Sequence, residues 1–187
     1  MYFLSKEAGG EVMKRVKNVN DKVKIRISGL SNGLHEYHFS AEPTVIGLEN
    51  NFQQPVEIDA QLDKATHQIY LKADVQTSGN FQCDRCLDDF AQELSASYRV
   101  FYMYNNNEGA KFPPEEIRFV TSDTIDIDLT DDVCQMVLLS VPLKLLCTEE
   151  CKGLCPHCGS NWNHNLCDCK EEIGDPRLQG LQDLLHN

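Results

Sequence analysis

The chain has 187 residues, of which 41% are hydrophobic and 25% charged, a composition typical of one soluble domain with a hydrophobic core. Its formal net charge of −12 excludes a broad basic face that would hold nucleic acid by neutralising phosphates. No run approaches the roughly 18 consecutive apolar residues of a membrane span, and the apolar patch near Met1 is too short for a signal peptide.

Residues 1–21 are expected to form a loose N-terminal lead-in, within which Met13 is an alternative start. The first 30 residues carry seven Lys or Arg against three acidic residues, a net charge of +4, so the other 157 residues sum to −16. A solvated arm beside the first strand is the simpler interpretation of this basic segment, and a local contact with RNA is the alternative.

From residue 22 the alternation of apolar and polar residues predicts a mainly antiparallel β-sheet with one wet face. The residues expected on the buried face are, strand by strand, Val23, Ile25 and Ile27; Tyr37 and Phe39; Val56, Ile58, Ala60 and Leu62; Ile69, Leu71, Ala73 and Val75; and Leu94, Ala96, Tyr98, Val100 and Tyr102. A loop rich in Asn, Gly and Pro is expected at 105–116, followed by short strands within 116–120 and 124–129.

The period then changes to that of a helix. A core helix is predicted at 130–141, with Thr130 as its cap and Pro142 after its end. Its apolar stripe consists of Val133, Met136 and Val137. A terminal helix is predicted at 175–185, where four leucines fall on one side.

Nine cysteines without a secretory signal are expected to be reduced thiols or metal ligands in a reducing, cytoplasmic compartment. Five of them lie between residues 151 and 169, and a four-thiolate site leaves one over. The turn "CPHCG" is a well-formed Cys-x-x-Cys knuckle, because Gly159 can adopt the positive φ that such a turn needs. With the later "CDC" pair, it is expected to form one closed site from Cys155, Cys158, Cys167 and Cys169.

The remaining cysteine of this stretch has a partner upstream, because Cys151 and Cys147 are separated by three residues and supply half of a second site. The other half is the "CDRC" turn at the end of a predicted strand. The second site is therefore expected to comprise Cys83, Cys86, Cys147 and Cys151, and to tie the C-terminal segment to the sheet. An interleaved pairing, in which Cys151 joins the C-terminal cluster, is the alternative.

Two closed tetrahedral thiolate sites favour zinc, with two ions per chain, because zinc is redox-inert and accepts all-sulfur coordination. A rubredoxin-like iron site satisfies the same spacing and is the alternative. The ninth cysteine, Cys134, lies beside the apolar stripe of the core helix, where a small buried thiol is the ordinary interpretation.

No catalytic motif accompanies the cysteines. The six histidines form no His-Glu-x-x-His or His-x-Glu pattern, and the chain has no Gly-rich phosphate loop. Neither an enzyme nor a small-molecule substrate is therefore expected. A thioredoxin-type redox pair at "CDRC" is disfavoured because an acidic, strand-like segment follows the turn where that motif needs a helix.

Four residues near the cysteines are candidate contacts with RNA or a partner: Arg85, Lys152, Trp162 and Arg177. An exposed Trp162 would offer a stacking surface for a base. Packing on the metal loop is the simpler interpretation of the tryptophan, and sulfur shielding or surface pairing is the simpler interpretation of the three cations.

The order of these motifs resembles the bacterial YceD family, whose members are named large ribosomal RNA subunit accumulation proteins and have relatives in plastids. The segments that carry the resemblance are "FQCDRCLDDF", "LLSVPLKLLC", "CKGLCPHCGSNWNHNLCDC" and "DPRLQGLQDL" within residues 20–185. The resemblance implies a role in accumulation of large-subunit ribosomal RNA, through processing or subunit assembly, without known catalysis. Some family members lack the second cluster, which implies that the Cys83/Cys86 site is the more basic feature.

The sequence thus predicts an α+β fold, mainly antiparallel sheet with one core helix, comprising a β-rich region at 22–141 and a zinc-braced segment at 142–187 that packs on the same domain. The expected function is that of a non-enzymatic zinc-binding factor supporting large-subunit ribosomal RNA accumulation. Expected partners are the ribosomal RNA precursor, a ribosomal protein or an assembly factor, with direct contact to RNA left open. The alternatives are a zinc-ribbon protein-interaction module unrelated to RNA and a Cys-x-x-Cys thiol redox protein.

Overall fold

The computed structural model describes residues 15–19, 22–48, 51–104 and 116–169. Its strands and helices are, in chain order, β1 (Arg15–Val19), β2 (Lys24–Arg26), β3 (Gly33–Ala41), α1 (Pro43–Ile46), β4 (Val56–Lys64), β5 (Gln68–Gln82), β6 (Asp89–Met103), β7 (Ile117–Phe119), β8 (Asp126–Asp128) and α2 (Thr130–Ser140). The predicted terminal helix at 175–185 and nearly all of the predicted loop at 105–116 lie outside the described residues.

The chain divides into two compact units. Unit 1 comprises Met1–Phe81 and Asp89–Leu145, and unit 2 comprises Gln82–Asp88 and Leu146–Asn187. The turn between β5 and β6 therefore belongs to the same unit as the cysteine-rich segment, although some sixty residues separate them in the chain. Whether residues 142–187 pack on the β-rich region as one domain stays a prediction.

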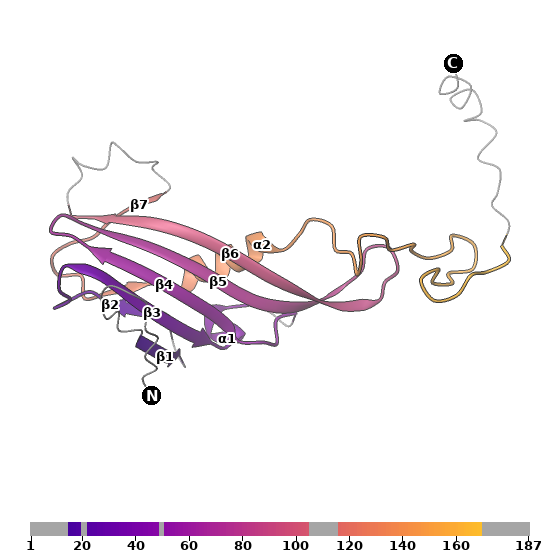
Figure 1. The fold of residues 1–187 in the computed structure, drawn as a ribbon, viewed down its shortest axis with the longest axis horizontal. Coiled ribbons are helices and arrows are strands. Elements are labelled where there is room, and N and C mark those ends of the chain that lie inside the picture. The colour runs from indigo at the N-terminus through magenta and orange to yellow at the C-terminus, as the bar shows by residue number, and fades with distance from the viewer. Residues whose placement is uncertain (1–14, 20–21, 49–50, 105–115, 170–187) are drawn as a thin grey trace, which may run out of the picture. The chain divides into compact units, whose positions relative to one another are not determined.

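Unit 1 is built on a six-stranded sheet in the order β1-β3-β4-β5-β6-β7 (Figure 1). Strand β3 pairs antiparallel with β4, and β4 with β5, whereas β1 and β7 add parallel strands at the two edges. A second, two-stranded sheet pairs β2 antiparallel with β8, with Ile25 opposite Ile127. The predicted α+β fold with mainly antiparallel strands is confirmed.

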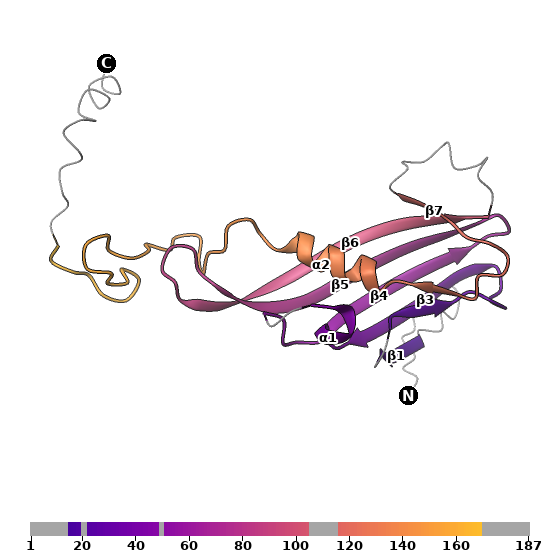
Figure 2. The same ribbon diagram turned by 180° about the vertical axis from the view of Figure 1, so that it is seen from behind.

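One face of the six-stranded sheet is covered by α1 and α2 (Figure 2), and the hydrophobic core lies there. All the predicted apolar positions from Val23 to Val75 are buried, as are Leu94, Val100 and Tyr102 on β6. Ala96 and Tyr98 are half-buried, because β6 lies near the edge of the sheet. Alternation along the strands thus located the core.

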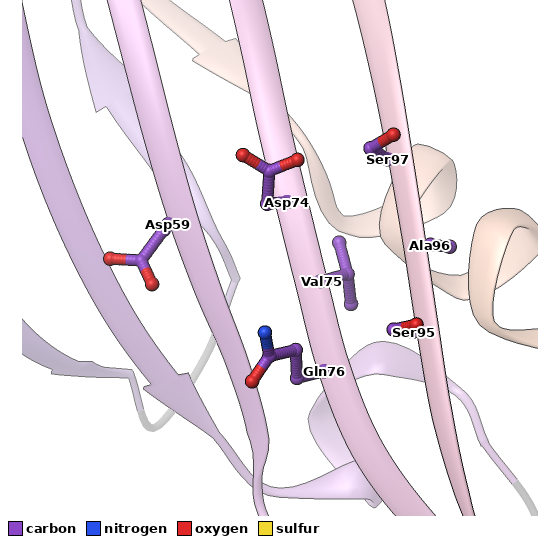
Figure 3. A pocket seen from close by; sticks show the side chains of 7 residues that line it. All are labelled: Asp59, Asp74, Val75, Gln76, Ser95, Ala96 and Ser97. Atoms are coloured by element: carbon purple, nitrogen blue, oxygen red, sulfur yellow. The ribbon is translucent and has the colours of Figure 1, made fainter.

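The opposite face of the sheet is polar (Figure 3). Asp59, Asp74, Gln76, Ser95 and Ser97 line a shallow hollow of about 440 Å³ across β4, β5 and β6. These polar residues alternate with core residues along the same strands, so this is the wet face that the alternation predicts.

The helix predicted at 130–141 is confirmed as α2, but the predicted capping role of Thr130 is wrong. Leu129 is the N-cap residue, and Thr130 Oγ1 instead accepts a hydrogen bond from the Val23 N–H at 3.0 Å. Asp128 Oδ1 accepts from the Thr130 N–H at 3.0 Å, so the nearby carboxylate satisfies an otherwise unpaired donor of the first turn. None of the helices within the described residues combines the length and the apolar character that crossing a lipid bilayer requires.

Strand β1 lies inside residues 1–21, where the sequence predicts a loose lead-in. It pairs in parallel with β3, from Arg15 opposite Tyr37 to Val19 opposite Ala41. Its five residues, RVKNV, are too few and too polar for a clear alternation. An edge strand needs only its backbone N–H and C=O groups to pair, so this strand was not predictable from pattern.

Candidate metal centres

The turn between β5 and β6 brings Cys83 and Cys86 together. Its backbone is closed twice, by Leu87 N–H donating to Cys83 O at 3.0 Å and by Cys83 N–H donating to Asp88 O at 2.9 Å. Leu87 has a φ of 61°, a left-handed conformation that costs a leucine about 1–2 kcal/mol. The knuckle thus forms although its fifth position holds a residue that disfavours this backbone.

The turn from Cys155 to Ser160 repeats the same pattern. Gly159 N–H donates to Cys155 O at 2.9 Å, and Cys155 N–H donates to Ser160 O at 2.8 Å. The φ of Gly159 is 74°, which confirms the positive value predicted for this residue. Leu87 and Gly159 occupy equivalent places in two knuckles of one design.

The first centre, as we call it, is the group of thiols Cys83, Cys86, Cys147 and Cys151, whose Sγ atoms all lie within 4.8 Å of one another. The Sγ–Sγ distance is 3.8 Å between Cys83 and Cys151, and 3.6 Å between Cys86 and Cys147. Zinc–sulfur bonds of about 2.3 Å in a tetrahedron place sulfurs about 3.8 Å apart. Because three of the four residues are buried, the group offers a closed donor set that fits a tetrahedral ion.

The second centre is the group Cys155, Cys158, Cys167 and Cys169, whose Sγ atoms also lie within 4.8 Å of one another. Cys155 is buried and Cys167 half-buried, whereas Cys158 and Cys169 are exposed. The donor set is chemically the same as in the first centre, but solvent reaches two of its four ligands. The structure thus brings the eight cysteines together in the two groups that their spacing indicates.

Each centre holds a thiol that ionises readily. The hydroxyl and N–H of Ser160 lower the pKa of Cys158 to about 6. Cys158 in turn, together with burial, raises the pKa of Cys169 to about 12. Burial favours a higher pKa for Cys83, but backbone N–H groups of Cys147 and of its own turn outweigh it and lower the pKa to about 6. Thiolate, the form that binds metal, is therefore available in both centres at neutral pH.

Two side chains donate N–H groups to sulfurs of the centres. Asn163 Nδ2 donates to Cys151 Sγ, and Trp162 Nε1 donates to Cys167 Sγ, each at 3.3 Å. Donors of this kind stabilise a thiolate and fix its position around an ion. Neither hydrogen bond was predicted, because each depends on how the loop folds back and not on a spacing in the sequence.

The four residues predicted as candidate contacts with RNA or a partner differ in placement. Arg85 Nη1 donates to the Cys151 carbonyl at 2.8 Å, and Trp162 is half-buried with its N–H on sulfur. Both side chains therefore brace the loops of the centres. Lys152 is exposed, and Arg177 lies outside the described residues. A contact of any of the four with RNA or a partner stays a prediction.

Cys134 belongs to unit 1, where it is half-buried on α2 and packs against the hydrophobic core. Burial, and to a smaller degree the Asp131 carboxylate, raise the pKa of its thiol. A neutral thiol against apolar neighbours behaves as a small hydrophobic side chain.

These observations define a class of protein: a mainly antiparallel α+β fold that carries two four-thiolate groups able to hold metal ions. Within that class, the chain belongs to the YceD family. The family model, described as "Large ribosomal RNA subunit accumulation protein YceD", matches residues 71–185, a span that includes all eight clustered cysteines. The resemblance seen in the motifs is thereby confirmed.

Relatives of the chain occur in bacteria and plants. It is 26% identical over 132 residues to the uncharacterized protein YlbN of Bacillus subtilis, which covers 70% of this chain and 74% of that protein. It is 21% identical over 154 residues to the chloroplastic large ribosomal RNA subunit accumulation protein YCED homolog 1 of Arabidopsis thaliana, and 24% over 159 residues to the Zea mays protein of that name. The matches span 65% and 70% of this chain but only 46% and 52% of these plant relatives. No solved structure matches the chain.

Proposed function

We propose that this chain is a zinc-dependent, non-catalytic factor that supports accumulation of large-subunit ribosomal RNA, by processing or subunit assembly, in the reducing environment of the cytoplasm. The observation that carries the proposal is the extent of the family match, which spans both centres. The centres therefore belong to the region that this chain shares with proteins named for that role. Eight thiols held in two groups suit a compartment in which thiols stay reduced.

A structural role for the metal follows from what unit 2 buries. In its described part the buried residues are four cysteines (Cys83, Cys86, Cys151 and Cys155) and Gly153. Such a segment has no hydrophobic core to fold around, so a metal must supply the free energy that orders it. Structural zinc provides about 10–16 kcal/mol of apparent binding free energy in small motifs. Four thiolates also fill the tetrahedron and leave no open position for a substrate or water, which favours structure over catalysis.

The charge of unit 2 favours a route to ribosomal RNA through a protein. Its described residues carry two basic and five acidic side chains, a formal charge of −3. Each divalent ion bound by four thiolates adds about two further negative charges. Phosphate backbones are repelled by such a surface, whereas the basic segments of a ribosomal protein or assembly factor are attracted to it.

Complementation tests the dependence on the centres. A host that lacks its own copy of this protein is supplied with the Cys83→Ser/Cys86→Ser variant. The matched control is Cys134→Ser, which removes a thiol outside both centres. We expect the double variant to bind fewer than two zinc ions and to lower large-subunit relative to small-subunit ribosomal RNA. Cys134→Ser should change neither. Full complementation by the double variant would refute the proposal.

Affinity purification with and without nuclease tests whether the chain reaches ribosomal RNA through a protein partner or by direct contact. A partner held through protein contacts stays bound after nuclease treatment, and we expect a large-subunit ribosomal protein or assembly factor in that fraction. Loss of all ribosomal material on nuclease treatment would show direct binding to RNA. Recovery of no ribosomal component in either condition would contradict the ribosomal role and support an interaction module of another kind.

A further inference from the structure

Residues 161–164, which we call the bridging loop, contact both groups of thiols. The loop lies in the chain between Cys158 and Cys167 of the second centre, yet it also donates a hydrogen bond to a sulfur of the first. We infer that the bridging loop couples the two centres, so that metal at one raises the affinity of the other, and that Asn163 is the positioning residue that carries this coupling. The inference rests on the proposed binding of metal at both centres.

On the side of the first centre, both ends of the Asn163 carboxamide are engaged. Its Nδ2 donates to Cys151 Sγ at 3.3 Å, and its Oδ1 accepts from the Lys152 N–H at 2.8 Å. Because Cys151 and Lys152 are adjacent, the Asn163 carboxamide binds the sulfur of the ligand and the backbone N–H that follows it at the same time. The N–H group is thereby held on the sulfur in a single orientation, which favours the thiolate that binds metal.

Asn161 supports this arrangement from within the loop. Its Oδ1 accepts from the backbone N–H and from Nδ2 of Asn163, each at 2.9 Å. Its own Nδ2 donates to Asp88 Oδ2 at 2.7 Å. Asp88 ends the knuckle of the first centre, where its carbonyl accepts from the Cys83 N–H. The loop thus contacts both halves of the first centre, the knuckle through Asn161 and the later pair through Asn163.

On the side of the second centre, Trp162 fixes the loop. Its Nε1 donates to Cys167 Sγ at 3.3 Å, and its backbone N–H donates to Gly153 O at 3.0 Å. An ion that holds Cys158 and Cys167 together also closes the segment between them, and closing a loop removes conformational freedom. Metal at the second centre therefore orders the segment that presents Asn163 before the first centre binds its own ion.

The size of the effect follows from outer-shell interactions in other metal sites, whose removal typically costs about 10–100-fold in metal affinity. Coupling between two binding sites is reciprocal, so the second centre gains the same factor when the first is loaded. Without a loaded second centre, the ordering of the loop must be achieved by the first centre alone, and its affinity falls by that factor.

Competition titrations with a chromophoric zinc chelator, on the full chain under reducing conditions, test the coupling. Cys158→Ser/Cys169→Ser leaves only the first centre, and Cys83→Ser/Cys86→Ser leaves only the second. We expect the product of the two zinc binding constants of the unaltered chain to exceed the product of the two single-centre constants by about 10–100-fold. Far-UV circular dichroism of each variant checks that the β-sheet of unit 1 remains folded.

Asn163→Asp then tests the residue. Aspartate keeps the shape of the side chain and the acceptor for the Lys152 N–H, but it replaces the donor to sulfur by an anionic oxygen. We therefore expect the product of the two zinc binding constants to fall most of the way to the product of the single-centre constants. Asn165→Asp is the matched control, because it adds the same charge at the exposed position directly after the bridging loop, and it should change the product by less than about twofold.

The outcomes separate the inference from the function on which it rests. Two zinc ions per chain with a product equal to that of the single-centre constants would overturn the coupling and leave the proposed centres standing. If Asn163→Asp and Asn165→Asp lower the product of the two zinc binding constants equally, the role of Asn163 is overturned. Fewer than two tightly bound ions in the unaltered chain would overturn the proposed centres, and the inference with them.

Discussion

The two units of this protein are built around different interiors. Unit 1 encloses a continuous hydrophobic cluster that includes Phe39, Ile58, Leu62 and Leu71, all fully buried. The described part of unit 2 buries thiols and one glycine. Apolar burial needs no cofactor, whereas clustered thiols repel one another once ionised and need a cation between them. Unit 1 should therefore fold without metal, and unit 2 should not.

Metal removal is the largest perturbation that separates the units. A strong chelator under reducing conditions should remove about 10–16 kcal/mol of apparent binding free energy per centre and leave unit 2 without ordered structure. Hydrogen exchange measured by mass spectrometry should show loss of protection at residues 82–88 and 146–169, with protection of β3, β4 and β5 retained. Loss of protection in both units together would contradict separate interiors.

A cavity in the core of unit 1 is the converse perturbation. Leu71 is fully buried on β5 opposite Leu62, so Leu71→Ala should lower the free energy of unfolding of unit 1 by about 2–5 kcal/mol. Denaturant unfolding measures this loss, and the zinc content should stay at two ions per chain. Gln76→Ala, on the wet face of the same strand, is the control and should change stability by less than about 0.5 kcal/mol.

The two knuckles can be compared by substituting, in each, the residue whose backbone is left-handed. Leu87→Gly relieves an unfavourable backbone and Gly159→Ala introduces one, each by about 1 kcal/mol. We expect Leu87→Gly to raise the zinc affinity of the first centre several-fold and Gly159→Ala to lower that of the second by a similar factor, in chelator competition. If both substitutions weaken binding, the two turns do not share one backbone design.

The smallest predicted effect is a pH dependence confined to unit 1. Burial alone would raise the pKa of Asp128, but hydrogen bonds from Thr130 and the nearby Lys22 and Lys24 outweigh it and lower the pKa. A carboxylate with a lowered pKa stabilises the fold above its unfolded-state pKa, and this contribution is lost as the pH falls through the folded-state value. Asp128→Asn should therefore cost roughly 0.5 kcal/mol at pH 7 and progressively less in acid, as the pH falls through the lowered folded-state pKa of Asp128. A loss of thermal stability that stays constant from pH 7 into the acid range would contradict this assignment.

The sequence predicted the interior of unit 1 well, because its strands are wet on one side and packed on the other. Every apolar strand position from Val23 to Val75 that the alternation assigned to the buried face is buried, whereas Ile46, Leu48 and Phe52 of the core were not predicted. The alternation of apolar and polar residues did not predict β1, a five-residue edge strand. The sequence also did not predict the first turn of α2, where Asp128 accepts a hydrogen bond from the Thr130 N–H. Backbone pairing determined β1, whereas a carboxylate two residues earlier in the chain satisfies the first turn of α2. The alternation of apolar and polar residues carries no information about either contact.

The two groups of thiols in unit 2 were predicted from counting and spacing, which work because a tetrahedral ion accepts four ligands. The surroundings of the thiols were not predictable in the same way. The first knuckle has a leucine, Leu87, at the fifth position, where a glycine is the ordinary residue. It adopts the left-handed conformation because hydrogen bonds close the turn at both ends. Asn163 has no signature either, because its role comes from a loop that returns to a ligand twelve residues away in the chain.

Zinc-edge X-ray absorption combined with metal counting tests the central claim, that sulfur and metal together form the interior of unit 2. We predict two zinc ions per chain, each with four sulfur neighbours at about 2.3 Å and no nitrogen or oxygen neighbour. Fewer than two ions, a shell that contains nitrogen or oxygen, or disulfides among the eight cysteines of a chain purified under reducing conditions would contradict the account.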